Sequence, residues 1–486
     1  MSFASAFSIL GWSLAILGGA MLGPAAAGFA MDEKVSGLIF LLSAAPTIFV
    51  GGGLIIASRG PRPHTARRES FVSVALIVLV LPVFAAIPLL GSGAIGGVLN
   101  AYFEAVSGLT TSGATVIGDL DSVDRSVVLW RSLLQWLGGV GAVVLAIVHF
   151  APRGVGGMQL YASPLVHGEQ DPLGERFRHA GISFSWVYAI LTGACILALW
   201  ISGLKFFDGI VLGLSTVSTG GFSPFNDSLA GLKNRTAEAV IVVFMILGAT
   251  NLTLHWQALR GKGFSVYLQD PEFPLLLGLM ITAGAALAVA LSLGENVDVL
   301  DAVWVGLFHA VSAISTTGFV TDQGQSVGWP VFGLMLLVIL MLIGGSTGSS
   351  GGGIKVMRAS LLIGLVRREF NRLAHPHGVV CIPYRGTGVE EAALRGIWAV
   401  FIAMVFTFGL LTVAMASFDV DFQNAAYIAV SAVTNTAPML GALVDQGVRV
   451  GDMNGGAKVA LTVGMILGRL EFLSVFVLLS PLFWRR

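Results

Sequence analysis

The stretch Ala105–Val116, AVSGLTTSGATV, places hydroxyl side chains and glycine in the middle of an apolar chain. Near-copies of it recur three times at intervals of about 100 residues, which indicates an internal repeat. The four segments are FEAVSGLTTSG ending at Gly113, IVLGLSTVSTG ending at Gly220, FHAVSAISTTG ending at Gly318, and YIAVSAVTNTA ending at Ala437. The fold therefore has to accommodate four polar turns of one kind.

The composition places these turns in a membrane protein. Among 486 residues, 55% are hydrophobic and 11% are charged, and the mean hydropathy is +0.85. Soluble domains carry about 25% charged residues. The formal net charge is zero, so nothing favours a nucleic-acid partner. The two cysteines, Cys195 and Cys381, provide neither a disulfide framework nor a metal-ligand cluster.

Long apolar runs predict the membrane-spanning helices, since a helix needs about 20 apolar residues to cross a bilayer and about ten such runs occur. We predict spans over residues 7–30, 36–57, 71–91, 127–150, 183–203, 236–257, 274–293, 329–345, 393–416 and 457–480. The first run lacks a basic leader and is followed at once by the second, so we expect it to be retained as a span.

Basic residues between these runs set the expected orientation. They cluster after every second run and at the end of the chain, which places both termini in the cytoplasm. The basic residues are Arg59, Arg62, Arg67, Arg68, Arg153, Arg176, Arg178, Arg260, Lys262, Lys355, Arg358, Arg367, Arg368, Arg372, Arg385, Arg485 and Arg486. The opposite loops carry Asp119, Asp121, Asp124, Asp227, Asp322, Asp445 and Asp452.

Each polar turn lies between two predicted spans, after an apolar run of about 10 to 15 residues that is too short to cross. Such a run fits a re-entrant helix entering from the acidic side. Its carbonyl end carries about half a negative charge and points towards the membrane centre, so four of them around one axis form a cation site. Backbone carbonyls beyond the helix can replace the hydration shell of an alkali cation. Glycine permits the positive φ that such a strand requires.

The turns supply a set of candidate filter residues. They are Thr111, Ser112, Gly113, Ser218, Thr219, Gly220, Thr316, Thr317, Gly318, Asn435, Thr436 and Ala437. A single cluster of this kind is usually a loop between helices. Four clusters in the same position, each after a short apolar run, favour an ion-selectivity filter over four unrelated loops.

With these residues the chain resembles the Trk/Ktr/HKT superfamily of potassium transporters, and the extra pair of N-terminal spans makes it most similar to the bacterial Trk-type membrane subunits. The resemblance also rests on WRSLLQWLGGVGAVVLA at 130–146, GVGGMQL at 154–160, GGSTGSSGGGIKVMR at 344–358 and GRLE at 468–471. It implies an all-α membrane protein with four membrane–pore-loop–membrane repeats around a central pore, preceded by two extra transmembrane helices. The expected units are the N-terminal pair (1–69), repeat 1 (70–181), repeat 2 (182–272), repeat 3 with a gating loop (273–391) and repeat 4 (392–486).

The resemblance also implies the partners. It implies a homodimer in the bacterial inner membrane and a cytoplasmic ring of nucleotide-binding regulatory subunits, with K⁺ as the bound ion, no cofactor in this chain and no enzymatic activity. The basic segment 355–395 fits contact with anionic lipid or docking of that partner. The chain contains no nucleotide fingerprint, so nucleotide sensing belongs to the partner.

One residue departs from the family pattern. The fourth filter segment of the family carries glycine where this chain has Ala437, followed by Pro438 and Met439. If the position requires a left-handed conformation, alanine costs about 1–2 kcal/mol. The fourth strand then takes a different backbone path or carries a less regular carbonyl ring. The resemblance implies selectivity for K⁺ over Na⁺, and Ala437 is the residue that bears on this selectivity.

A glycine-rich run falls where the eighth span is expected to lie in the bilayer. The candidate gating residues are Gly344, Gly345, Ser346, Thr347, Gly348, Ser349, Ser350, Gly351, Gly352, Gly353 and Lys355. The spacing of Lys355 does not match a phosphate-binding loop, and a cytoplasmic linker is the other alternative. We expect a flexible break below the filter that acts as a movable barrier, and the resemblance implies the same.

Arg469 lies near the middle of the last predicted span, where snorkelling to the interface is difficult. We expect it to face the pore below the filter and to oppose cation occupancy, as the resemblance also implies. The alternative is a buried structural ion pair. Glu471 is not the obvious partner, because two positions on an α-helix differ by about 200°.

These observations predict the pore-forming subunit of a potassium uptake system, gated by a cytoplasmic regulatory subunit. The membrane potential supplies about 2.3 kcal/mol per charge per 100 mV, so no hydrolysis site is needed here. A Na⁺- or H⁺-coupled secondary transporter is the alternative, and inverted repeats would support it, whereas these repeats share one orientation. A membrane enzyme would need clustered intramembrane His, Cys or Asp, which the sequence lacks.

Overall fold

The computed structural model describes residues 4–59, 67–146, 173–294, 297–326, 328–375, 381–385, 387–444 and 448–470. Within these ranges seven helices are long and apolar enough to cross a membrane. They are α1 (Ala4–Ala30), α2 (Lys34–Ala57), α3 (Arg67–Gly91), α5 (Arg125–Leu145), α6 (Leu173–Ile201), α11 (Glu272–Gly294) and α16 (Glu391–Ala416). The protein is therefore an all-α membrane protein, and the predicted spans 1–3, 5, 7 and 9 are confirmed. The fourth is confirmed as far as α5 extends, and residues 147–150 of that prediction lie outside the described residues.

The sixth predicted span is not a continuous helix. Helix α8 (Arg235–Ala249) and helix α9 (Leu252–Gln257), which continues into a π-turn (Ala258–Lys262), meet at an angle of 96°. Asn251 caps α9 by accepting the Thr253 N–H (2.8 Å), and the Leu252 N–H donates to the Gly348 carbonyl (3.2 Å). The predicted run over 236–257 is therefore apolar as expected but broken, and hydropathy does not reveal the cap that breaks it.

The eighth predicted span differs from expectation, and the tenth is described only in part. Helix α14 (Val331–Ile343) has only 13 residues and ends at Gly344, whose φ is +71°. It is thus too short to cross alone. Helix α19 (Gly455–Arg469) begins the tenth span, and residues 471–480 of that prediction lie outside the described residues.

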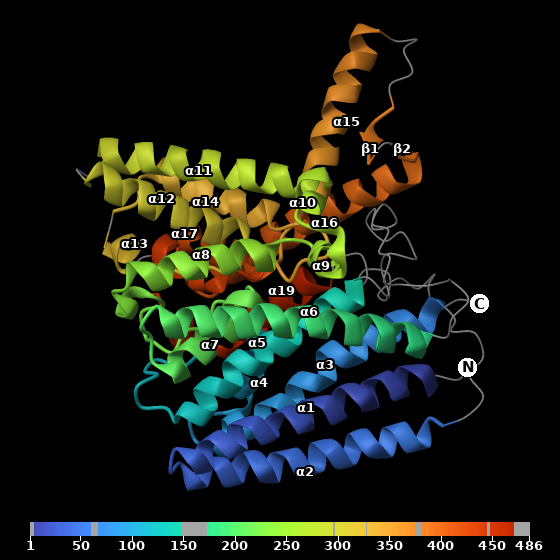
Figure 1. Ribbon diagram of the computed structural model, residues 1–486, viewed down its shortest axis with the longest axis vertical. Helices are drawn as coiled ribbons and strands as arrows, with labels where there is room; N and C mark the ends of the chain where they lie inside the picture. Colours follow the sequence, from blue (N-terminus) through green and yellow to red (C-terminus); the bar gives the residue numbers. More distant parts are fainter. Residues whose placement is uncertain are drawn as a thin grey trace.

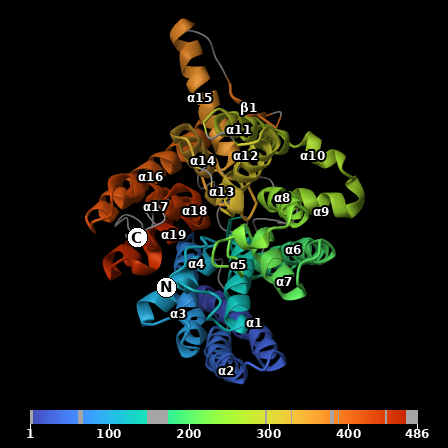
Figure 2. The same cartoon turned by 90° about the vertical axis from the view of Figure 1, so that its left-hand side faces the viewer.

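Four short helices, of 12 to 16 residues, each follow a long membrane-spanning helix in the chain. They are α4 (Val98–Leu109), α7 (Phe206–Val217), α12 (Val299–Ile314) and α17 (Phe422–Thr434). Asp298 and Asp421 cap α12 and α17 by accepting backbone N–H groups of the first turn, which also places negative charge at a helix N-terminus, where it is favourable. Viewed along the long helices, these short helices surround the middle of the molecule, with α1 and α2 at one edge (Figure 2).

The remaining elements are small, apart from one projecting helix. They are α10 (Ser265–Gln269), α13 (Asp322–Ser326), α15 (Val356–Ala374), α18 (Leu440–Leu443), 3₁₀ turns at Ala230–Leu232, Ala437–Met439 and Val450–Asp452, and strands β1 (Pro383–Tyr384) and β2 (Thr387–Gly388). The two strands pair as an antiparallel hairpin. Helix α15 projects from the bundle beside this hairpin, and α1 begins at the same end of the bundle (Figure 1).

Glycines allow α1 and α2 to pack closely. A Cβ atom at Gly51 would lie 2.8 Å from the Gly11 carbonyl oxygen and 2.8 Å from the Ala15 nitrogen. Both neighbours are backbone atoms of α1, so they cannot rotate away. Close backbone approach through small residues is a common means of helix association in membranes, where lipid removes the hydrophobic driving force between helices.

We expect Gly51→Ala to lower the free energy of unfolding by about 1–3 kcal/mol, because the added methyl group overpacks this contact. Thermal unfolding of the detergent-solubilised protein measures the change as a lower Tm. Gly52→Ala is the matched control, since a Cβ atom there meets nothing within 4 Å. Equal Tm values for the two variants would contradict the close contact.

Candidate functional site

The four short helices end in the same turn. One residue just beyond each helix adopts a left-handed conformation, at Thr111 (φ +55°), Thr219 (φ +53°), Thr316 (φ +60°) and Asn435 (φ +56°). In the first three turns it is the second residue after the helix end, and in the fourth it is the first. The N–H of the next residue then donates to a serine carbonyl five positions earlier. These bonds are Ser112 to Ser107 (2.9 Å), Gly220 to Ser215 (2.9 Å), Thr317 to Ser312 (3.1 Å) and Thr436 to Ser431 (2.8 Å). One backbone motif therefore occurs four times.

These hydrogen bonds correct the register of the second turn. Ser112 corresponds to Gly220, so Gly113 corresponds to Gly221 and not to Gly220. The backbone angles agree, with φ of +76° at Gly113, +80° at Gly221 and +79° at Gly318. The alignment made from the sequence was wrong by one residue, because two adjacent glycines fit equally well until the backbone is known. Ser218, assigned to the filter from the sequence, is the C-cap of α7.

The fourth turn departs from the other three after Thr436. Ala437 opens a right-handed 3₁₀ turn, Ala437–Met439, so it carries no left-handed strain. Its N–H donates to the Ser112 carbonyl of the first turn (2.8 Å). Of the two alternatives left by the sequence, the structure therefore has the different backbone path.

The turns converge on one point. A Cβ atom at Gly113 would lie 2.3 Å from the Gly220 carbonyl oxygen and 2.6 Å from Pro438 Cγ. One at Gly221 would lie 2.1 Å from the Thr317 carbonyl oxygen and 2.5 Å from Pro438 Cγ. One at Gly318 would lie 3.0 Å from Pro438 Cδ. The structure thus brings all four predicted segments together, with the Pro438 ring among three glycines.

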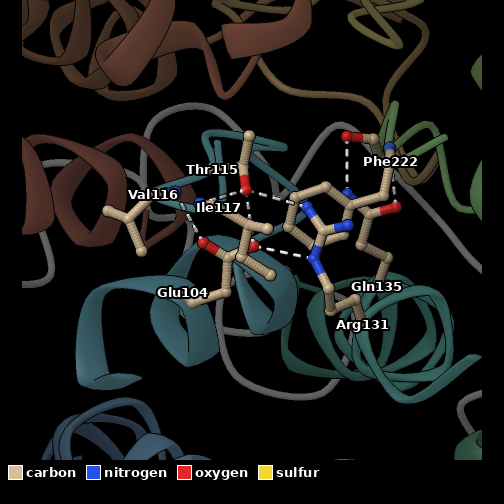
Figure 3. A network of polar contacts seen from close by, with 8 residues as sticks. Glu104, Thr115, Val116, Ile117, Arg131, Gln135 and Phe222 are labelled. Atoms are coloured by element: carbon tan, nitrogen blue, oxygen red, sulfur yellow. Dashed lines mark hydrogen bonds and ion pairs between the residues drawn. The ribbon is translucent and has the colours of Figure 1, made fainter. Parts of the chain in front are cut away.

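A buried ion pair supports the first turn from behind (Figure 3). Glu104 on α4 and Arg131 on α5 are 0% and 2% exposed, and Arg131 Nε lies 2.7 Å from Glu104 Oε1. The Glu104 carboxylate also accepts the Thr115 hydroxyl (2.9 Å) and the Val116 N–H (2.8 Å). The Arg131 guanidinium lies 4.1 Å from the ring centroid of Phe222. The pair therefore links the chain beyond the first turn to α5 and to the chain beyond the second turn.

Gln135, one helical turn after Arg131, holds the second turn (Figure 3). Its Nε2 donates to the Gly220 carbonyl (2.7 Å), and its Oε1 accepts the Ser215 hydroxyl (2.9 Å) and the Phe222 N–H (3.1 Å). Analysis of the sequence missed both Arg131 and Gln135. The available signal was two polar side chains four residues apart on one face of an apolar span.

The glycine-rich loop, residues 344–353, lies against these turns. Hydrogen bonds from the Ile354 N–H to the Leu342 carbonyl (2.9 Å) and from the Lys355 N–H to the Ile343 carbonyl (2.8 Å) close its neck. The Gly352 N–H donates to Thr316 Oγ1 (2.7 Å). The loop therefore contacts the third turn directly.

Ser350 and Gly352 extend these contacts to the second and fourth turns. The Ser350 hydroxyl donates to the Val217 and Gly248 carbonyls (both 3.1 Å). A Cβ atom at Gly352 would lie 2.0 Å from the Thr434 carbonyl oxygen. Lys355, which has a φ of +82°, places its ammonium on the Gly351 carbonyl and Ser349 Oγ (3.3 Å). The predicted gating residues thus lie next to the predicted filter residues.

Arg469 is the last residue of α19 and reaches the same loop. Its Nη1 donates to the Ser350 carbonyl (2.7 Å). Its Nε and Nη2 are buried and have no hydrogen-bond partner among the described residues. Glu471, weighed as a partner in the sequence, lies outside those residues. The structure therefore places the arginine beside the glycine-rich loop.

The fold and these turns define an α-helical membrane transport protein. Residues 38–485 match the TrkH family of cation transport proteins. The chain belongs to this family, as its resemblance to the Trk/Ktr/HKT superfamily predicted, and its members are membrane transporters and not enzymes.

Named relatives and a solved structure agree with this assignment. The Trk system potassium uptake protein TrkH of Salmonella typhimurium is 33% identical over 491 residues, covering 100% of both chains. The Trk system potassium uptake protein TrkG of Escherichia coli is 29% identical over 469 residues, covering 96% of this chain and 95% of that protein. The crystal structure of the potassium transporter TrkH from Vibrio parahaemolyticus matches with a TM-score of 0.89 at 31% identity, covering 100% of both chains.

We expect Glu104→Gln to lower the free energy of unfolding by about 3–5 kcal/mol, because it leaves the buried Arg131 charge uncompensated. Thermal unfolding in detergent measures the loss. The double variant Glu104→Gln/Arg131→Met removes both charges and should recover most of the stability. A double variant as unstable as the single one would show that the ion pair is not the cause.

Proposed function

We propose that this chain is the pore-forming subunit of a potassium uptake system and conducts K⁺ through a filter made by the four turns. The observation that carries the proposal is the convergence of four helix ends with one backbone motif on a single point. The names of the relatives, which are potassium uptake proteins, support K⁺ as the ion. With the corrected register, the filter residues are Thr111, Ser112, Gly113, Thr219, Gly220, Gly221, Thr316, Thr317, Gly318, Asn435, Thr436 and Ala437.

The chemistry of the filter follows from its backbone. The carbonyl ends of α4, α7, α12 and α17 together direct partial negative charge at the point of convergence, which favours a cation there. Carbonyl oxygens then replace the water around the ion. The membrane potential drives the ion inward, and the chain itself needs no bound cofactor.

The glycine-rich loop and Arg469 form the barrier of the proposed pore. The loop contacts the second, third and fourth turns, and Arg469 binds its Ser350 carbonyl. A positive charge at this place opposes a cation, and the opposition is strong because the surroundings have a low dielectric constant. Opening therefore requires the loop to move, and we assign control of that movement to a cytoplasmic regulatory subunit.

The proposed organisation follows the order of the helices. Residues 70–181, 182–272, 273–391 and 392–486 contribute the short helices α4, α7, α12 and α17 in turn, and residues 1–69 contribute the extra pair α1 and α2. We assign the assembly as a homodimer in the bacterial inner membrane, with both termini in the cytoplasm. The basic helix α15 and the start of α1 lie at one end of the bundle, which supports that orientation (Figure 1).

A Na⁺- or H⁺-coupled secondary transporter is the second candidate, because a broken helix such as α8–α9 is common in that class. In this protein the break hydrogen-bonds to the glycine-rich loop and not to an open cavity. Dependence of uptake on a Na⁺ or proton gradient would favour this candidate over the pore.

Ion flux into liposomes tests the pore and its barrier together. We expect the purified protein to pass K⁺ and Rb⁺ well above Na⁺ and Li⁺, and Arg469→Ala to raise the K⁺ flux severalfold by removing the positive charge. Arg449→Ala is the matched control, since Arg449 is exposed and outside the site. The absence of flux for every alkali cation, even with the regulatory partner added, would refute the pore.

We expect Ala437→Gly to raise the ratio of K⁺ to Na⁺ flux, because glycine lets the fourth turn adopt the left-handed conformation of the other three. The same liposome assay measures the ratio. Ala442→Gly, in the neighbouring helix α18, controls for added flexibility. An unchanged ratio would mean that the fourth strand does not set selectivity.

A further inference from the structure

Glu272, the first residue of α11, is a buried carboxylate outside the proposed filter and barrier. It is 2% exposed. Its Oε2 accepts the Thr347 N–H of the glycine-rich loop (2.7 Å), and its Oε1 accepts the Tyr384 hydroxyl of strand β1 (3.0 Å). A single side chain therefore contacts both the loop beneath the turns and the hairpin that follows α15.

An ion pair between Asp270 and Arg385 also holds the hairpin against the start of α11. Asp270 Oδ1 accepts the Glu272 N–H (3.0 Å), which orients the start of α11. Asp270 Oδ2 lies 2.5 Å from Nη2 of Arg385, the residue after Tyr384. Asp270 and Glu272, two acidic residues separated by Pro271, thus hold the adjacent residues Tyr384 and Arg385 of the hairpin.

Tyr384 is buried and packs with apolar residues of α15 and α16, namely Leu361, Leu365 and Ile397. Burial raises the pKa of its hydroxyl well above the usual range, so the group stays protonated and donates to Glu272. A cavity of about 420 Å³ lies beside this contact, lined by Glu272, Arg367, Arg368, Cys381 and Tyr384 among others. The cavity leaves room for the hairpin to shift.

The bond from Thr347 to Glu272 connects the loop to the end of the bundle where the hairpin lies. Other N–H groups of the loop donate towards the turns or the broken helix, such as Gly352 to Thr316 and Ser346 to the Ala249 carbonyl (2.9 Å). A carboxylate is a stronger acceptor than a neutral carbonyl. Loss of this bond therefore removes the anchor of the loop on the hairpin side, while its neck stays closed.

We infer that Glu272 is a positioning residue that couples the position of the β1–β2 hairpin to that of the glycine-rich loop. A docked hairpin holds the carboxylate against Thr347 and keeps the loop under the turns. When the hairpin is displaced, the Glu272 carboxylate loses the hydrogen bond from Tyr384 that helps to orient it, and the loop is released. The inference rests on the proposed function only where it treats the loop as the barrier.

Hydrogen exchange of the 344–353 amides tests the coupling without any ion flux. The variants are Glu272→Gln, Tyr384→Phe and the double variant. Tyr267→Phe is the matched control, because its hydroxyl bonds to His255 (2.7 Å) and not to Glu272. We expect Glu272→Gln and Tyr384→Phe each to speed exchange at Thr347 by about tenfold, as for the loss of a hydrogen bond to a charged group. The double variant should exchange no faster than Glu272→Gln alone.

The decisive variant is Tyr384→Phe, which removes one oxygen atom and does not touch Thr347. Unchanged exchange at Thr347 in this variant would overturn the inference, even if Glu272→Gln fails to fold. Liposome flux of Rb⁺, measured in parallel, should rise in the same variants. Faster exchange with no flux in any variant would support the coupling and refute the proposed pore.

Discussion

In the interior of a membrane every backbone N–H and C=O group needs a partner within the protein, because no water is available to bind it. This constraint explains why the irregular segments of this protein lie against one another. The Ser346 N–H donates to the Ala249 carbonyl, and the Leu252 N–H donates to the Gly348 carbonyl, so the break between α8 and α9 and the glycine-rich loop satisfy each other. Neither segment would be stable at this depth without the other.

The same requirement accounts for the buried polar side chains around the turns. A buried ion pair adds little stability by itself, since removing two charges from water offsets their attraction. Glu104, Arg131 and Gln135 instead hold particular backbone groups, including the Val116 N–H and the Gly220 carbonyl. Their contribution is conformational, because they fix the chain segments after the first and second turns, which have no regular secondary structure. Helix α5, which carries Arg131 and Gln135, is the rigid support for both of these segments.

The sequence predicted the elements whose signal is local. The length of each apolar run located the long helices, and the four polar turns located the ends of α4, α7, α12 and α17. It did not predict the break at Asn251, because a cap contributes almost nothing to hydropathy. The equivalence of Gly221 with Gly113 was also hidden, since it depends on backbone angles. Glu272 could not be found, because its two partners are distant in the chain and only the fold brings them together.

The polar contacts of the glycine-rich loop set what its movement involves. The N–H groups of Ser346, Thr347 and Gly352 and the carbonyl of Ser350 all bind partners outside the loop. If the loop leaves, those groups and their former partners are exposed together, and only water can replace the lost bonds. Displacement of the loop is therefore a wetting transition, in which water must enter the space that the loop leaves as that space opens.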